Sequence, residues 1–155
     1  MGNKYQIPYI NACIRAFAKR FKLSVQIAFE YLYTFKGIQF LVEFYEIEHL
    51  QSIDDAVDDL IVCCQNNGGT LRWNYITEQI LESPMTTQAQ KDFLVNHIVD
   101  RLTEFLVTDN SLELADALKI VYQSETYLRL QDVDGSLYVQ SPSYVYELLQ
   151  KELKR

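Results

Sequence analysis

Four aspartates in one short segment have the clearest potential for chemistry. Asp54-Asp55 and Asp58-Asp59 are two adjacent pairs, four residues apart, in SIDDAVDDLIVCCQNNGG. In a helix this spacing puts members of both pairs on one side, where carboxylates could bind a divalent cation. No third type of ligand converges with them in the sequence. Ser52 is a favoured first residue of a helix, and acids in the first turn suit the helix dipole. We therefore expect a helix cap and a solvated surface, without a metal.

The other reactive residue types are isolated in the sequence. Neither His49 nor His97 belongs to an H-E-x-x-H pattern or to a group of cysteines and histidines. The three cysteines lack metal-ligand spacing, and no serine stands in a G-x-S-x-G elbow. We therefore expect no catalytic residues, no cofactor and no enzymatic activity. The alternative is an enzyme in which a pocket joins one of the histidines to several carboxylates.

The segment Asp132-Val133-Asp134-Gly135 resembles the middle of a calcium-binding loop. When its glycine is aligned with the glycine of such a loop, Leu130 falls on the first ligand position and Ser141 on the last. Neither residue carries a carboxylate, so the main ligands of a calcium site are lacking. Aspartate and glycine also favour turns, and a turn is the structure that we expect here.

Charge is distributed unevenly along the 155 residues. Residues 1–36 contain six basic side chains and one acid, a net charge of +5, whereas residues 37–71 contain seven carboxylates and no lysine or arginine, a net charge of −7. The whole chain also carries −7, which counts against nucleic-acid binding through a basic surface. The basic opening either pairs with the acidic block inside the fold or faces a separate partner.

The composition is that of a folded protein, with 48% hydrophobic and 13% aromatic residues. No apolar run approaches the roughly 20 residues that span a bilayer, and the first residues lack the apolar core of a signal sequence. An odd number of cysteines without a signal peptide fits a reducing compartment. We therefore expect a cytoplasmic location.

Apolar residues recur at spacings of three and four along most of the chain, which predicts helices. Residues 127–139 instead fit either a short β-hairpin or an ordered loop. The expected fold class is all-α, a compact bundle of about seven or eight short helices with at most one small β-hairpin near 128–139. The expected helices lie near residues 8–20, 25–36, 38–48, 53–66, 71–82, 88–107, 112–122 and 142–153.

Small polar residues and glycines mark where these helices begin and end. Serine, threonine and asparagine begin helices, proline follows in the first turn, and glycine favours the C-terminal end. Two of the starts, at Ser52 and Thr87, have the spacing of a capping box. The expected N-caps are Ser24, Ser52, Thr87 with Gln90, Asn110 or Ser111, and Ser141 before Pro142, and the expected C-terminal glycine is Gly37.

A domain boundary is expected between Asn66 and Thr70, where two asparagines and two glycines follow the acidic helix. It would separate an acidic helical domain, residues 1–69, from a C-terminal helical region, residues 70–155. The two regions either pack together as one unit or act separately.

Residues 10–69 resemble a family of small bacterial domains of unknown function. The resemblance rests on KLSVQIAFEYLYTFKGIQFLVEFYEIEHLQ followed by SIDDAVDDLIVCCQNNGG, and above all on F-Y-x-x-x-H before an acid-rich capped helix. It implies a toxin–antitoxin role, because members are often encoded beside proteins resembling ADP-ribosyltransferase toxins. The ending LYVQSPSYVYELLQKEL, residues 137–153, is similar to the endings of small proteins from such operons. The resemblance supplies no catalytic residues.

The leading hypothesis is a non-catalytic interaction protein, the antitoxin-like partner of a toxin that resembles ADP-ribosyltransferases. Carboxylates would steer the encounter, and aromatic side chains would anchor it. One alternative is a nucleic-acid-binding regulator of its own operon, using basic residues between 15 and 22. Another is a homo-oligomeric helical protein without a toxin partner. The expected partner contacts are Glu43, Glu46, Asp54, Asp55, Asp58, Asp59, Tyr144, Tyr146 and Leu149.

Overall fold

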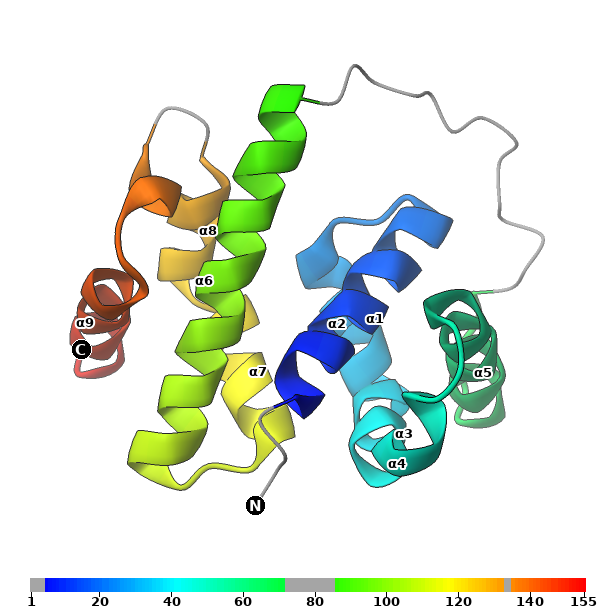
Figure 1. Ribbon diagram of the computed structural model, residues 1–155. Helices are drawn as coiled ribbons and strands as arrows, with labels where there is room; N and C mark the ends of the chain where they lie inside the picture. Colours follow the sequence, from blue (N-terminus) through cyan, green and yellow to red (C-terminus); the bar gives the residue numbers. More distant parts are fainter. Residues whose placement is uncertain (1–4, 72–85, 133–134) are drawn as a thin grey trace. The chain divides into compact units, whose positions relative to one another are not determined.

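The computed structural model describes residues 5–71, 86–132 and 135–155, with side chains of the second range described from residue 91 onward. Within these ranges all regular structure is helical, so the all-α prediction is confirmed. The chain forms two compact units, residues 1–80 and 81–155, whose helices are shown in Figure 1. The boundary predicted near residue 69 stays a prediction, as does the packing of the two regions. The predicted helix at 71–82 lies almost entirely outside the described residues.

The first unit is built around its longest helix, α1 (Gln6–Phe21). This helix packs against α2 and α5, while α3 packs against α2 and α5 as well. Helical spacing predicts the buried faces of α1 and α5 correctly, because Ile10, Ile14 and Phe17 of α1 are fully buried, together with Leu60 of α5. The same spacing placed Phe44 on the inner face of residues 38–48, but Phe44 is 41% exposed. The other helices of this unit are α2 (Val25–Thr34), α3 (Gly37–Glu43), α4 (Tyr45–Glu48) and α5 (Ile53–Asn66).

Serine caps begin two of these helices as predicted. The Ser24 hydroxyl accepts a hydrogen bond from the backbone N–H of Ile27 at 3.1 Å, and α2 follows. The Ser52 hydroxyl accepts one from the N–H of Asp55, also at 3.1 Å, at the start of α5. Each bond satisfies a donor that the first turn of a helix leaves without a partner.

Gly37 does not end α2, contrary to the prediction. The helix ends at Thr34, Lys36 takes the left-handed conformation with φ of 68°, and Gly37 begins α3. A Cβ at Gly37 would stand 2.8 Å from Leu32 Cδ2 and 3.2 Å from Cys64 Sγ. The glycine is therefore required by close packing against α2 and α5. The helix predicted at 38–48 is also divided, because Phe44 leaves helical geometry between α3 and α4.

The second unit is centred on α6 (Thr86–Asn110), which packs against α7 (Leu114–Tyr122) and α9 (Pro142–Leu153). Its buried face includes Ile98, Leu102 and Leu106, as predicted. The apolar residues Phe93 and Leu94 of the same helix are 71% and 37% exposed. The helical spacing that buries Val95, Ile98 and Val99 turns Phe93 to the opposite side and leaves Leu94 at the edge of the buried face.

The second unit differs from prediction at two helix boundaries and in the segments 125–131 and 137–139. The helix α6 continues to Asn110, and Ser111 after it is left-handed with φ of 53°. The N-cap of α7 is Glu113, so neither Asn110 nor Ser111 caps that helix. Residues 125–131 form α8 (Glu125–Gln131) and Leu137–Val139 forms a 3₁₀ helix, where a hairpin or loop was expected. Ser141 caps α9 as predicted, by accepting from the N–H of Tyr144 at 3.2 Å. The Thr87–Gln90 capping box lies outside the described side chains.

Candidate interaction surface

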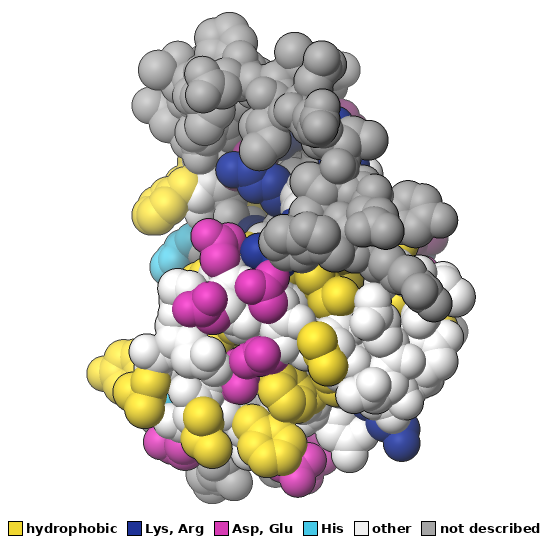
Figure 2. Space-filling model, turned by 90° about the vertical axis from the view of Figure 1, so that its right-hand side faces the viewer, with side chains coloured by type: hydrophobic (Ala, Val, Ile, Leu, Met, Phe, Trp, Pro, Cys, Tyr) yellow, Lys and Arg dark blue, Asp and Glu magenta, His cyan; other side chains and the backbone are white. Residues whose placement is uncertain are grey.

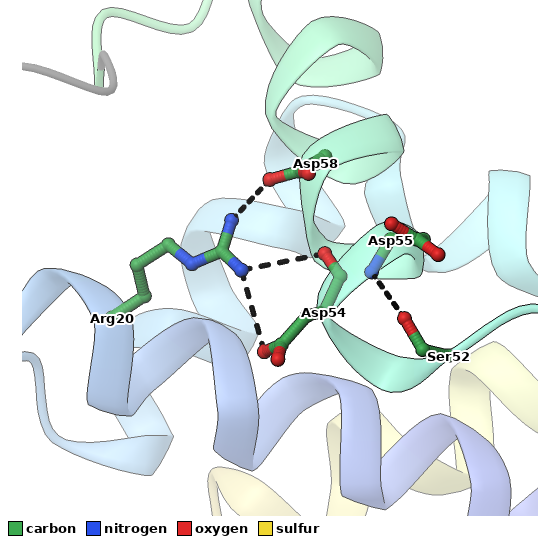
Figure 3. A network of polar contacts seen from close by, with 5 residues as sticks. All are labelled: Arg20, Ser52, Asp54, Asp55 and Asp58. Atoms are coloured by element: carbon green, nitrogen blue, oxygen red, sulfur yellow. Dashed lines mark hydrogen bonds and ion pairs between the residues drawn. The ribbon is translucent and has the colours of Figure 1, made fainter.

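Arg20, on α1, links the basic opening of the chain to the acidic block. Its guanidinium donates to Asp58 Oδ1 at 2.5 Å, and its second nitrogen lies 3.3 Å from the Asp54 carbonyl oxygen and 3.5 Å from Asp54 Oδ1 (Figure 3). The Arg20 side chain is 14% exposed, against 89% for Asp54 and 49% for Asp58. Arg20 therefore neutralises part of the acidic block inside the first unit. This agrees with the alternative in which the basic opening of the chain pairs with the acidic block within the fold.

The remaining expected carboxylates differ in their surroundings. Glu43, Glu46 and Asp55 are exposed, and none of them forms an ion pair with a residue in the described ranges. Asp59 is half-buried and accepts a hydrogen bond from Gln51 Nε2 at 3.2 Å. Figure 2 shows acidic side chains gathered on the face where α5 lies, with hydrophobic side chains beside them. This surface is negative and partly apolar.

The segment around α4 turns hydrophobic side chains toward water. Phe44, Ile47 and Leu50 are 41%, 62% and 78% exposed. The N–H of Ile47 donates to Phe44 O at 3.0 Å, and the N–H of Leu50 to Ile47 O at 3.2 Å. The N–H of Glu48 also donates to Phe44 O at 2.9 Å, so the segment has both three-residue and four-residue hydrogen bonds. In such a helix, residues three apart lie on the same side. We call these three residues the apolar stripe.

The opposite face of the same segment is buried and contains a carboxylate. Tyr45 is 7% exposed and Glu48 is 5% exposed, and Glu48 Oε2 has no hydrogen-bond partner among the described residues. The Tyr45 ring meets the Tyr9 ring edge to face, with 5.5 Å between centroids. Burial, followed by the nearby Asp59 carboxylate, raises the pKa of Glu48. Sequence reasoning placed Glu48 only within the acidic block and did not distinguish it from its exposed neighbours.

Replacing Glu48 with glutamine is expected to stabilise the first unit by about 1 kcal/mol at pH 7. The amide removes a buried charge and can donate to the Asp59 carboxylate. Because the folded-state pKa of Glu48 is raised, the wild type loses stability as pH rises from the ordinary glutamate value through the folded value. The advantage of Glu48→Gln should therefore vanish near pH 4 and grow as the pH rises through the folded-state pKa of Glu48. Urea unfolding across that range measures it, and a variant less stable than wild type at pH 7 would contradict the expectation.

The cysteines and histidines lie in surroundings that suit structural roles. Burial raises the pKa of Cys13 to about 11 and that of Cys64 to about 12, so both thiols are protonated at neutral pH and poor nucleophiles. His49 stands directly after α4, with Nδ1 2.6 Å from Tyr45 O and its ring stacked on the Tyr45 ring. His97 is exposed. Across residues 5–71, 86–132 and 135–155, no group of three histidine, cysteine or acidic side chains could hold a metal ion.

Two of the expected partner contacts on the C-terminal helix α9 are buried in the second unit. Tyr146 is 7% exposed and Leu149 is fully buried, whereas Tyr144 is 47% exposed. The Tyr146 ring packs on Phe105 of α6, with 5.0 Å between centroids. A helix that buries Val145 also buries position 149, one turn later, so Leu149 belongs to the core face. Of these three residues, only Tyr144 is on the surface.

The first unit is thus a helical domain with an acidic, partly apolar surface. Residues 9–67, which include most of α1 and all of α2 to α5, match the model of a family described as "Protein of unknown function (DUF3791)". The sequence-based resemblance to a domain of unknown function is confirmed to this extent. Neither the curated proteins nor the solved structures yielded a match to the chain. In the part of the chain that the structure describes, no helix is both long enough and apolar enough to cross a membrane.

Proposed function

We propose that the protein is a non-catalytic interaction protein whose first unit binds a partner protein. The observation that carries this proposal is the surface around α4, where Phe44, Ile47 and Leu50 are exposed beside the carboxylates Glu43 and Glu46. Grouped exposed hydrophobic side chains with a polar border are typical of protein-binding surfaces. Negative charge would select a partner with a basic surface and speed the encounter.

We further propose that this partner is a toxin resembling ADP-ribosyltransferases, which the chain neutralises as an antitoxin. The support is the sequence resemblance, since its family members are often encoded beside such toxins. An acidic surface suits this role, because it can cover a basic substrate groove and exclude the substrate.

Two alternatives have less support. A nucleic-acid-binding role would draw on the basic residues between 15 and 22, but the Arg20 side chain is held by Asp54 and Asp58. A homodimer formed through the acidic face would put like charges opposite each other, because a two-fold interface uses the same patch on both subunits.

Co-expression with the product of the neighbouring gene tests the proposed function. The expected result is a complex that survives purification and restores growth in cells that produce the partner. A charge-reversed form, Glu43→Lys with Glu46→Lys, should purify as a folded protein yet weaken the complex. If the wild-type chain neither binds the neighbouring product nor relieves its toxicity, the antitoxin proposal is wrong.

A further inference from the structure

The short α4 segment has an inverted arrangement of polar and apolar side chains. Its buried face includes a carboxylate, Glu48, whereas Ile47 and Leu50 point into water. Burying a carboxylate without a full set of hydrogen bonds costs stability, and exposing two large aliphatic side chains forgoes the gain from burying them. Folding of the unit alone does not explain this arrangement. Departures from the rule of an apolar interior concentrate at functional surfaces.

The apolar stripe also extends beyond α4. The Phe40 ring, on α3, contacts the Phe44 ring with 5.2 Å between centroids, and Phe40 is half-buried. Aromatic and aliphatic groups therefore continue from α3 across α4 to Leu50. A run of this kind is long enough to meet about two turns of a partner helix, whose apolar side chains recur at three and four residues.

The charges beside the stripe specify the polar part of that partner. Glu43 and Glu46 each precede a stripe residue in the sequence, and both are exposed. Asp54 and Asp58, by contrast, are engaged by Arg20 within the unit. Among the described residues, the negative charge next to the stripe that has no ion-pair partner is therefore that of the two glutamates. Lysine or arginine beside the apolar face of a partner would complement it.

We propose that the apolar stripe, with Glu43 and Glu46, is the docking surface for an amphipathic helix of the partner protein that has lysine or arginine beside its apolar face. The inference rests on the proposed function and moves the contact from the aspartates of α5 to α4. A second copy of this chain does not fit, since a two-fold contact through the stripe would bring its glutamates together. An anionic membrane surface is also disfavoured, because its negative charge would repel the same glutamates.

Binding of a synthetic amphipathic peptide of leucine and lysine, about 14 residues long, tests the surface directly. Fluorescence anisotropy of the labelled peptide would be measured with the full-length chain and with Ile47→Ser/Leu50→Ser. The matched control is Ile27→Ser/Val62→Ser, because those residues are 54% and 55% exposed outside the stripe. We expect the stripe variant to bind about tenfold or more weakly and the control to bind within about twofold of wild type.

Two further binding measurements distinguish a requirement for charge from non-specific hydrophobic binding. A peptide with glutamate in place of lysine should show no binding, and Glu43→Gln/Glu46→Gln should weaken the lysine peptide and reduce its salt dependence. Equal loss in the stripe and control variants, or equal binding of both peptides, would overturn the inference. So would failure of the wild-type chain to bind the lysine peptide.

The same variants in the co-expression assay keep this inference distinct from the proposed function. If wild type and Ile47→Ser/Leu50→Ser relieve toxicity equally, the antitoxin role stands and the docking surface is wrong. If wild type binds the peptide through the stripe but has no effect on the neighbouring product, the docking surface stands and the antitoxin role is wrong.

Discussion

Replacing Phe17 with alanine is expected to lower the free energy of unfolding by about 3–5 kcal/mol. Phe17 is fully buried on α1, where its ring packs against Phe21 at 4.8 Å and Tyr31 at 5.7 Å between centroids. The substitution removes an entire ring from the centre of the first unit, and close-packed neighbours relax only partly into the space. Urea unfolding followed by far-ultraviolet circular dichroism measures the loss.

The matched control is Phe44→Ala in the same unit. Phe44 is 41% exposed and belongs to the apolar stripe, so its loss should cost less than about 1 kcal/mol. The comparison separates a phenylalanine that stabilises the fold from one that we assign to partner binding. Equal destabilisation by the two substitutions would show that the stripe is part of the core, and would remove the basis for the docking surface.

Replacing Glu152 with alanine is expected to destabilise the second unit by about 2–3 kcal/mol at pH 7. This carboxylate, on α9, accepts hydrogen bonds from the N–H of Glu125 at 2.7 Å, from the N–H of Thr126 at 3.0 Å and from Thr126 Oγ1 at 2.7 Å. It therefore occupies the N-terminus of α8, where a negative charge also suits the helix dipole. Alanine would leave these three donors without their acceptor. A suitable control is Glu147→Ala, on the exposed side of α9, which should change stability by less than about 0.5 kcal/mol.

The contribution of Glu152 should depend on pH in the opposite sense to that of Glu48. Burial raises the pKa of Glu152, but hydrogen bonds from Thr126 and the backbone outweigh burial and leave its pKa lowered. A lowered folded-state pKa gives stability that is present above the ordinary glutamate value and is lost as pH falls through the folded value. The difference between wild type and Glu152→Ala should therefore shrink below about pH 4. A difference that grows on acidification would contradict the hydrogen-bonded, ionised state.

Local signals in the sequence predict much of this fold correctly. Ser24, Ser52 and Ser141 cap helices because their hydroxyls bond donors three residues ahead, which is a purely local matter. The buried faces of α1 and α5 follow from helical spacing in the same way. Ser124, which accepts from the N–H of Tyr127 at 3.0 Å, is a cap of the same kind that we did not predict.

Features that depend on distant residues could not be predicted. The helix α8 is capped at its start by Glu152, 26 residues beyond Thr126, and near its end Lys91 Nζ donates to Gln131 O at 2.8 Å. Neither partner is adjacent in sequence, and the local cap at Ser124 was overlooked, so residues 127–139 were interpreted as a hairpin or a loop. Gly37 was assigned to a helix end because glycine often occurs there, whereas its role is to admit Leu32 and Cys64.

The candidate site shows the same division between local and distant information. An acidic surface was predicted from residues 37–71, and Glu43, Glu46 and Asp55 are exposed as that prediction requires. The sequence EFYEIEHL does not reveal which glutamate is buried, because Glu46 and Glu48 both lie one residue from Ile47. The helical geometry of the α4 segment decides it, because it places Glu48 on the buried side with Tyr45 and turns Ile47 outward.

Amide hydrogen exchange of the full-length chain, alone and with the product of the neighbouring gene, tests the central claim most directly. The account predicts that binding slows exchange at residues 43–51, where the stripe and its glutamates lie, and leaves exchange in the buried part of α1 unchanged. Slower exchange elsewhere on the chain, with residues 43–51 exchanging at the same rate in both samples, would contradict the claim that this surface binds the partner.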